Sequence, residues 1–148
     1  MSRLGAAVNI ITTDGLAGRH GLTVSAVCSV TDLPPTLLVS INRASQSHTK
    51  LLANGVLCVN VLTGRHEDLS RKFAGGAAGE ERFVGFEWKR LITGSPVLAD
   101  ASVACDCAIS STTDVGSHTI LMCEVLAVAL SAEPLGLVYF DRRYHAIS

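Results

Sequence analysis

Aromatic residues, net charge and long hydrophobic runs are all scarce in this chain of 148 residues. Phe, Trp and Tyr make up only 5% of the sequence, so a stacking platform for nucleic-acid bases is not expected. The formal net charge is −1 and no basic run exceeds two residues, as at Arg142-Arg143, which argues against a nucleic-acid surface. The longest apolar stretch, Ile120 to Ala132, spans about 13 residues and contains Glu124, whereas a membrane-spanning helix needs about 20. We therefore expect neither a nucleic-acid nor a membrane partner.

The cysteines form no recognisable disulfide or metal pattern. There are five of them, an odd number, and the apolar start of the chain contains Asn9 and no cleavage site typical of secretion. Both features favour reduced thiols in a cytoplasmic protein. Cys105 and Cys107 form a C-x-C pair, but no second cysteine pair or spaced histidine pair completes a metal site. Because residues two apart share one face of a strand, we interpret these thiols as core residues and expect no metal.

Material for a core is nevertheless ample, since 48% of the residues are hydrophobic and 17% are charged. A chain of this length corresponds to one domain, which we place over residues 1–148. The hydrophobic pattern has mostly a period of two, which predicts strands. The expected strands cover 6–13, 22–30, 36–42, 56–62, the surroundings of Trp88, 102–111, 118–130 and the stretch 136–147.

A short helix is expected between the third and fourth of these strands. Ser47 is its predicted N-cap, and Gly55 marks the end, because glycine accepts the left-handed conformation common after a helix. Leu51 and Leu52 are expected to point inward.

A second short helix is expected over 64–74, with Thr63 as its cap and with Asp68 and Lys72 forming an ion pair one turn apart. The glycine-rich segment 75–82 then predicts a loop. Seven or so strands with two short helices and no repeat indicate a mainly β protein, a closed or nearly closed antiparallel barrel.

Fingerprints of several enzyme classes are missing. The segment "GLAGRHG" is not G-x-G-x-x-G, no phosphate loop follows "GGAAG", and no G-x-S-x-G elbow occurs. Cys28 could act as a nucleophile, but no local signature supports that role.

Four polar segments remain, and each has a functional and a purely structural interpretation. "GLTVS" (21–25) offers backbone N–H groups beside two hydroxyls, or is only a half-exposed strand. "NRASQSH" (42–48) precedes a helix start that would favour a phosphate, or is only a helix cap. "GSH" (116–118) carries a histidine that either binds a ligand or caps a strand. "RRYH" (142–145) places Tyr144 and His145 on opposite strand faces, or is a polar terminus.

Taken together, several longer segments resemble one family. The stretches "GAAVNIITTDGLAGRHGLTVSAVCSVTDLPPTLLVSINR", "LCVNVL", "ERF", "VGSHTIL" and "GLVYFDRRYH" resemble, in the same order and spacing, the short-chain flavin reductases that serve two-component monooxygenases. The likeness extends from about Arg3 to Ile147. It implies the FMN-binding split-barrel fold, a mainly β antiparallel barrel with a few short helices, and a homodimer.

The resemblance also implies residue roles. Segment 23–29 matches the part of the family that lines the isoalloxazine ring, segment 42–48 the part that approaches the ribityl chain and phosphate, and residues 82–83 the pair that closes over the flavin. The segments around His118 and Tyr144 match the nicotinamide side, where His118 would be the catalytic residue. The implied flavin-binding residues are Thr23, Val24, Ser25, Ala26, Cys28, Ser29, Asn42, Arg43, Ser45, Gln46, Ser47, His48, Arg82 and Phe83, and the implied NADH-binding residues are Ser117, His118, Tyr144 and His145.

The implied activity is the reduction of FMN by NADH, followed by release of the reduced flavin to a partner monooxygenase. In this chemistry the two cofactors carry the hydride step and the protein supplies orientation, which agrees with the lack of a catalytic dyad. The segment 42–48 varies among relatives, so FAD stays possible beside FMN. The alternatives are a split-barrel protein that keeps its flavin tightly bound and a barrel that serves only as an interaction module.

Overall fold

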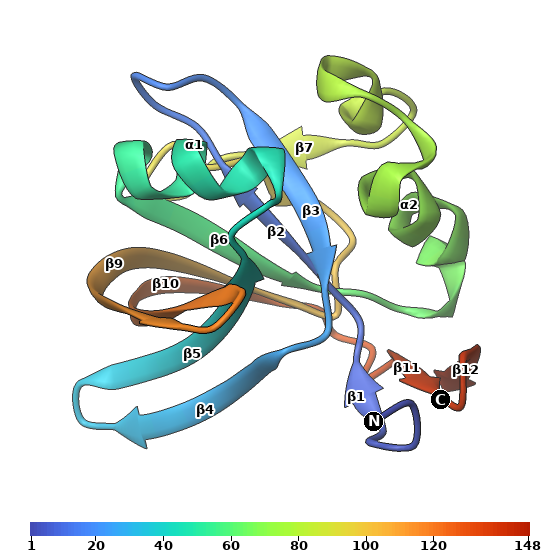
Figure 1. Ribbon diagram of the computed structural model, residues 1–148. Helices are drawn as coiled ribbons and strands as arrows, with labels where there is room; N and C mark the ends of the chain where they lie inside the picture. The colour runs from blue at the N-terminus through green and yellow to red at the C-terminus, as the bar shows by residue number, and fades with distance from the viewer.

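A curled, seven-stranded antiparallel sheet forms the body of the protein, described here by a computed structural model of residues 1–148 (Figure 1). The order of its strands is β3-β2-β6-β9-β10-β5-β4. The two edge strands, β3 and β4, are consecutive in the chain, and only Ser25 and Ala26 separate them. The sheet therefore curls until its edges meet at one corner, as in a split barrel. The strands are β2 (Asn9–Thr13), β3 (His20–Val24), β4 (Val27–Asp32), β5 (Pro35–Asn42), β6 (Val56–Val61), β9 (Val103–Val115) and β10 (His118–Leu130).

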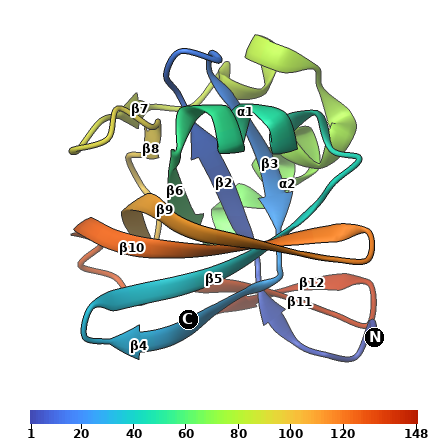
Figure 2. The ribbon, with the colours of Figure 1, turned by 60° about the vertical axis from the view of Figure 1, so that its left-hand side comes forward.

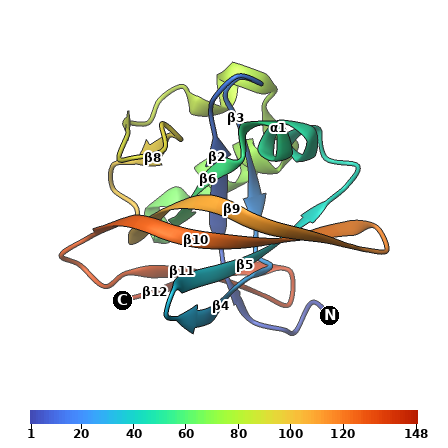
Figure 3. The same cartoon turned by 90° about the vertical axis from the view of Figure 1, so that its left-hand side faces the viewer.

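Two small sheets extend this body. The hairpin of β11 (Gly136–Phe140) and β12 (Arg143–Ile147) pairs with β1 (Ala6–Ala7), so both ends of the chain contribute to one sheet. Figures 2 and 3 show this hairpin on the same side of the body as β4 and β5. The second small sheet consists of β7 (Trp88–Lys89) and β8 (Val97–Leu98).

The first helix, α1 (Gln46–Asn54), confirms the predicted element and its end at Gly55, which has a φ of 71°. The predicted N-cap was wrong by two residues: Ser45 is the cap, and its hydroxyl accepts from the Ser47 amide at 3.1 Å. Ser47 is buried instead, and its hydroxyl donates to the Gly21 carbonyl of β3 at 3.4 Å. Leu51 is buried as predicted, but Leu52 is 41% exposed, since successive helix positions point about 100° apart.

The second helical segment is a chain of short turns: η1 (Gly64–His66), α2 (Glu67–Arg71), a π turn η2 (Lys72–Gly76) and η3 (Gly79–Phe83). Thr63 caps it as predicted, accepting from the Arg65 amide. The predicted Asp68–Lys72 pair is absent, because Asp68 pairs with Arg71 and the Lys72 ammonium donates to the Val84 carbonyl. The predicted loop 75–82 overlaps η3. No helix has the length and apolar character needed to cross a membrane.

Three of the expected strands are each divided in two. The stretch 6–13 separates at Val8 into β1, which pairs with β11, and β2, which belongs to the seven-stranded sheet. The alternation over 22–30 breaks at the corner after Val24, and beyond it Ala26, Cys28 and Val30 are exposed, whereas Val24 is buried. The stretch 136–147 turns at Asp141 and Arg142, which both have positive φ, and returns as β12.

Cys107 is a core residue as predicted, and Cys105, its partner in the C-x-C pair, is half-buried. Cys58 and Cys123 are also buried, whereas Cys28 is exposed. Burial raises the pKa of the Cys107 thiol, and it raises that of Cys123 to about 12, so both are held protonated and unreactive.

Candidate functional site

A groove runs along β3, between the sheet and the segment α2–η3. It consists of two neighbouring cavities, of about 290 and 240 Å³, that share Thr23 and Ala74. The first is lined by His20, Leu22, Thr23, Ser45, Gln46, Phe73, Ala74, Gly75 and Arg82. The second is lined by Val8, Thr23, Ser25, Ser70, Ala74, Tyr139 and Tyr144.

The first cavity has positive polarity at one end. The start of α1 contributes Ser45 and Gln46, where backbone N–H groups lack helical partners, and Arg82 adds a guanidinium. His20 is buried, and its Nδ1 lies 2.5 Å from the Ser47 hydroxyl oxygen. Burial, followed by the charges of Arg82 and Lys50, lowers the pKa of His20. The ring is therefore neutral at physiological pH, and this end of the groove suits an anionic group.

Arg82 fastens the segment that forms one wall of the groove. Its guanidinium donates to the Gly21 carbonyl at 2.7 Å and to the Ala77 carbonyl at 2.8 Å. The neighbouring Phe83 is buried and packs edge-on against Phe73, with ring centroids 5.0 Å apart. Because both of these Arg82 contacts end on backbone oxygens, its first role is to hold η3 against β3.

A second set of contacts, beside those of Arg82, also holds this segment. Arg19 stacks over the Phe83 ring, 4.3 Å from its centroid, and forms an ion pair with Glu80. The hydrogen bond from Arg19 lowers the pKa of Glu80.

The second cavity is more apolar and contains two aromatic rings. Tyr139 and Tyr144 meet edge to face with centroids 5.1 Å apart. The Tyr144 hydroxyl lies 2.8 Å from the Ser70 hydroxyl, and Thr23 donates to the Ser70 carbonyl at 2.6 Å. Ser70 therefore joins β3 to β12 across the floor of the cavity, while Ser25 remains exposed at its rim. Flat apolar walls with a few hydroxyls suit a planar heteroaromatic ring.

The tip of the β9–β10 hairpin lies elsewhere. Ser117 and His118 line neither cavity. The Arg43 amide donates to the Ser117 carbonyl at 2.9 Å, and His118 pairs in register with Asn42, so the tip lies beside the segment that leads into α1. The Ser117 hydroxyl lies 2.8 Å from Nδ1 of His118, which leaves Nε2 of this ring as its open nitrogen.

The structure brings together only part of the residue set implied by the resemblance. Val24, Ser47 and Phe83 are buried just behind the groove wall. The remaining residues outside the groove lie in four places: at the β3–β4 corner and on β4, from the end of β5 into α1, at the β9–β10 hairpin tip, and on β12. The residues that line the groove are Thr23, Ser25, Ser45, Gln46, Arg82 and Tyr144; those that do not are Ala26, Cys28, Ser29, Asn42, Arg43, His48, Ser117, His118 and His145.

Several lining residues were not identified from the sequence. His20 directly precedes "GLTVS", so its position on the same strand was the available signal. No local pattern marked Ser70, Phe73, Ala74 or Tyr139. The first three reach the groove only because α2 and η2 contact β3, and Tyr139 reaches it from the separate sheet that contains β11.

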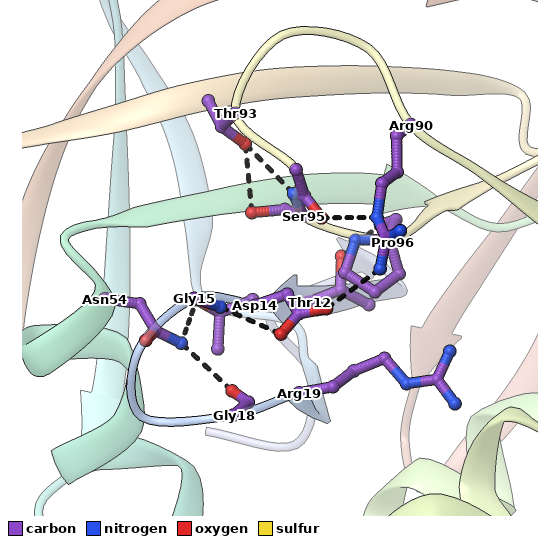
Figure 4. Close-up of polar contacts among 12 residues, drawn as sticks. Thr12, Asp14, Gly15, Gly18, Arg19, Asn54, Arg90, Thr93, Ser95 and Pro96 are labelled. Atoms are coloured by element: carbon purple, nitrogen blue, oxygen red, sulfur yellow. Dashed lines mark hydrogen bonds and ion pairs between the residues drawn. The ribbon is translucent and has the colours of Figure 1, made fainter.

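A polar cluster around Arg90 lies at the loop between β2 and β3 (Figure 4). Arg90 donates to the Gly94 carbonyl and to the Asp14 carboxylate, each at 3.0 Å. Asn54 bonds to the Gly18 carbonyl and to the Ala17 amide. These contacts tie the β2–β3 loop to α1 and to the 90–96 segment, so we assign them a structural role.

Comparison with known proteins agrees with this geometry. The model of the flavin reductase like domain matches residues 1–148. An FMN reductase (NADH) RutF from Variovorax paradoxus is 55% identical over 148 residues, which cover all of this chain and 82% of the relative. The crystal structure of a Haemophilus somnus protein provisionally assigned as a flavin reductase is 46% identical, with a TM-score of 0.96, over 99% of this chain and 94% of that one.

A third similar protein is the flavin reductase of styrene monooxygenase from Pseudomonas putida S12. It is 25% identical with a TM-score of 0.87, over 99% of this chain and 94% of that chain. This chain thus combines a mainly β, split-barrel architecture and a groove along β3 with a match to one family over its whole length. The chain belongs to the flavin reductase family.

Proposed function

We propose that this protein reduces FMN with NADH and releases the reduced flavin to a partner monooxygenase. The observation that carries the proposal is the groove along β3, with a cationic end and an aromatic end, in a chain of the flavin reductase family. Hydride transfer between the two substrates needs close and oriented approach, and the protein supplies that orientation.

The two ends of the groove suit the two ends of FMN. Gln46, Ser45 and Arg82 offer donors and positive charge at the end where a phosphate would bind. Tyr139, Tyr144 and Val8 offer apolar walls where the isoalloxazine ring would lie, with Ser25 at the rim to bond its polar edge. The fit favours FMN as the flavin, and FAD is the alternative substrate that the assay below compares with it.

The assay is steady-state oxidation of NADH at 340 nm with FMN, FAD and riboflavin in turn, repeated with NADPH. We expect turnover with FMN, and higher rates with NADH than with NADPH. Equal or better rates with NADPH would overturn the preference, and no turnover with any flavin would overturn the function. If the flavin instead stays on the protein through dialysis and after reduction, the chain is a tightly bound flavoprotein and not a donor of reduced flavin.

We further propose that the active form is a homodimer. Leu126, Val128 and Leu130 form an exposed apolar row on β10, and Val30 and Leu33 are exposed on the β4–β5 hairpin. A second copy would bury these side chains, and it could bring His118 to a groove that His118 does not line within one chain. Light scattering during chromatography should give twice the mass of one chain; an active monomer at assay concentration would contradict this.

The five free thiols support a reducing, cytoplasmic setting for this reaction.

A further inference from the structure

A hydrogen-bonded network lies where the β9–β10 hairpin meets α1. Nε2 of His48, on α1, lies 2.8 Å from the hydroxyl oxygen of Thr119, and that hydroxyl donates to the Asp114 carboxylate at 2.7 Å. Thr119 is only 1% exposed, so water does not compete for these bonds. The network therefore joins an acidic residue on β9, a buried hydroxyl on β10 and an imidazole on the helix.

The direction of the protons in this network follows from the chemistry of its members. An ionised carboxylate can only accept, so the single hydroxyl proton of Thr119 points to Asp114. The oxygen of Thr119 must then accept from His48, which places a proton on Nε2 of that ring. A neutral His48 consequently carries its lone pair on Nδ1.

The network lies directly beside the hairpin tip. Thr119 is paired in register with both Asp114 and Ile41, and the tip is the segment between Asp114 and Thr119. Arg43 adds to the same junction, because its guanidinium donates to the Gly116 carbonyl at 3.2 Å and lies 3.9 Å from Asp114. Ser117 and His118 are thus held against the segment that leads into α1.

We propose that Thr119 and Asp114 are positioning residues that hold the Ser117–His118 tip against the start of α1 and keep His48 in its Nε2–H form. The inference rests on the proposed function, in which the tip contacts NADH while the start of α1 contacts FMN. It deepens that function, since one network connects the contacts of both substrates, although Thr119 and Asp114 line neither cavity.

The test compares Thr119→Val with Thr119→Ser and with the control Thr113→Val. Valine keeps the shape of threonine and removes the hydroxyl, serine keeps the hydroxyl, and Thr113 is an exposed residue of the same hairpin. In Thr119→Val we expect kcat/KM for NADH to fall about tenfold through misplacement of the tip, while the Kd for FMN rises by no more than about twofold. Thr119→Ser should restore kcat/KM, and Thr113→Val should match the wild type.

Nuclear magnetic resonance of the histidine nitrogens supplies a readout that does not depend on turnover. We expect neutral His48 to be the Nε2–H tautomer in the wild type and in Thr119→Ser, and to lose this preference in Thr119→Val. Kinetics of Thr119→Val equal to those of Thr113→Val, or an unchanged His48 tautomer, would overturn the proposal.

Asp114→Ala provides a second route if Thr119→Val does not fold. The Asp114 side chain is 60% exposed, so its loss leaves no buried cavity, and we expect the same direction of change in kcat/KM for NADH. Unchanged NADH kinetics in Asp114→Ala would then overturn the inference. A wild type that oxidises no NADH with any flavin refutes the proposed function instead, and the tautomer measurement still tests the network.

Discussion

Replacing Gly21 by alanine would drive a methyl group into the ring that forms part of the groove wall. A Cβ built on Gly21 lies 2.7 Å from Cε1 of Phe73 and 3.1 Å from the carbonyl oxygen of Ile11. The Ile11 carbonyl belongs to the neighbouring strand β2 and cannot move without breaking the sheet. The Phe73 ring is 1% exposed and is packed against Phe83 and Trp88, so the space open to it is the first cavity, which it lines.

The expected cost is that of overpacking a filled core, about 1–3 kcal/mol of unfolding free energy. In a chain of this size each kcal/mol lowers Tm by about 2–4 °C, so Gly21→Ala should lower Tm by roughly 2–12 °C. Because the displaced Phe73 lines the first cavity, the affinity for FMN should fall as well.

Thermal unfolding followed by circular dichroism, and flavin fluorescence quenching, measure these two effects. Gly136→Ala is the matched control, since a Cβ there lies 3.7 Å from its nearest neighbour, Cβ of Ile147, and the residue is also in a strand. Its Tm should stay at or slightly above the wild-type value. A Gly21→Ala protein with the Tm and FMN affinity of the wild type would refute the reasoning.

Three further predictions concern the polar residues. His118→Ala should lower kcat/KM for NADH, through a loss of about 1–3 kcal/mol of transition-state stabilisation, and should leave flavin affinity nearly intact. Ser25→Ala should instead weaken flavin binding first. An unchanged kcat/KM in His118→Ala would refute the assignment of His118 to the NADH side. Arg82→Met should weaken FMN binding and increase amide exchange in 72–83, because two bonds to backbone carbonyls are lost; exchange equal to wild type would contradict the tie. Because the folded-state pKa of His20 is lowered from 6.5, its contribution to stability is present above about pH 6.5 and is lost as pH falls through the folded pKa; denaturant unfolding should show a shallower acid-side decline in His20→Gln, and an identical decline would exclude this cause.

The strands were largely predictable because their alternation is local. The predicted strand 118–130 coincides with β10, His118–Leu130. The alternation over 22–30, however, continues through the corner after Val24, where the chain leaves one edge of the sheet for the other. Nothing in the pattern marks that change of direction, so the face of β4 could not be assigned correctly.

The N-cap illustrates the same limit at a single residue. Ser45 and Ser47 are both serines, a residue type that favours the N-cap position, so the sequence is equally consistent with a helix that starts after either one. The buried imidazole of His20 decides between them, because it forms a hydrogen bond with the Ser47 hydroxyl. His20 is 27 residues away from Ser47 in the sequence. A tertiary contact of this kind is invisible to a local rule.

The candidate site was predictable only where the resemblance met local geometry. Thr23 and Ser25, two of the implied flavin-binding residues, lie on or next to one strand, and both line the groove. His118 was implied to act in the same site, yet it lines neither cavity, because β10 pairs with β5 and the hairpin tip lies beside the segment that leads into α1. The spacing of the motif does not encode this pairing.

One wall of the groove is held by side chains and not by strand pairing, which bears on how a product could leave. The segment 72–83 forms no ladder with the sheet. Arg82 binds it to Gly21 of β3, and Glu80 binds it to Arg19, which directly precedes β3. Opening this wall breaks the two Arg82 bonds, at about 1.5–3 kcal/mol each at most, and exposes the buried rings of Phe73 and Phe83, but it leaves the pairing of the seven-stranded sheet intact. Local opening of this wall therefore costs less than global unfolding. That difference suits an enzyme whose reduced flavin must leave the groove and reach a second protein while the barrel remains intact.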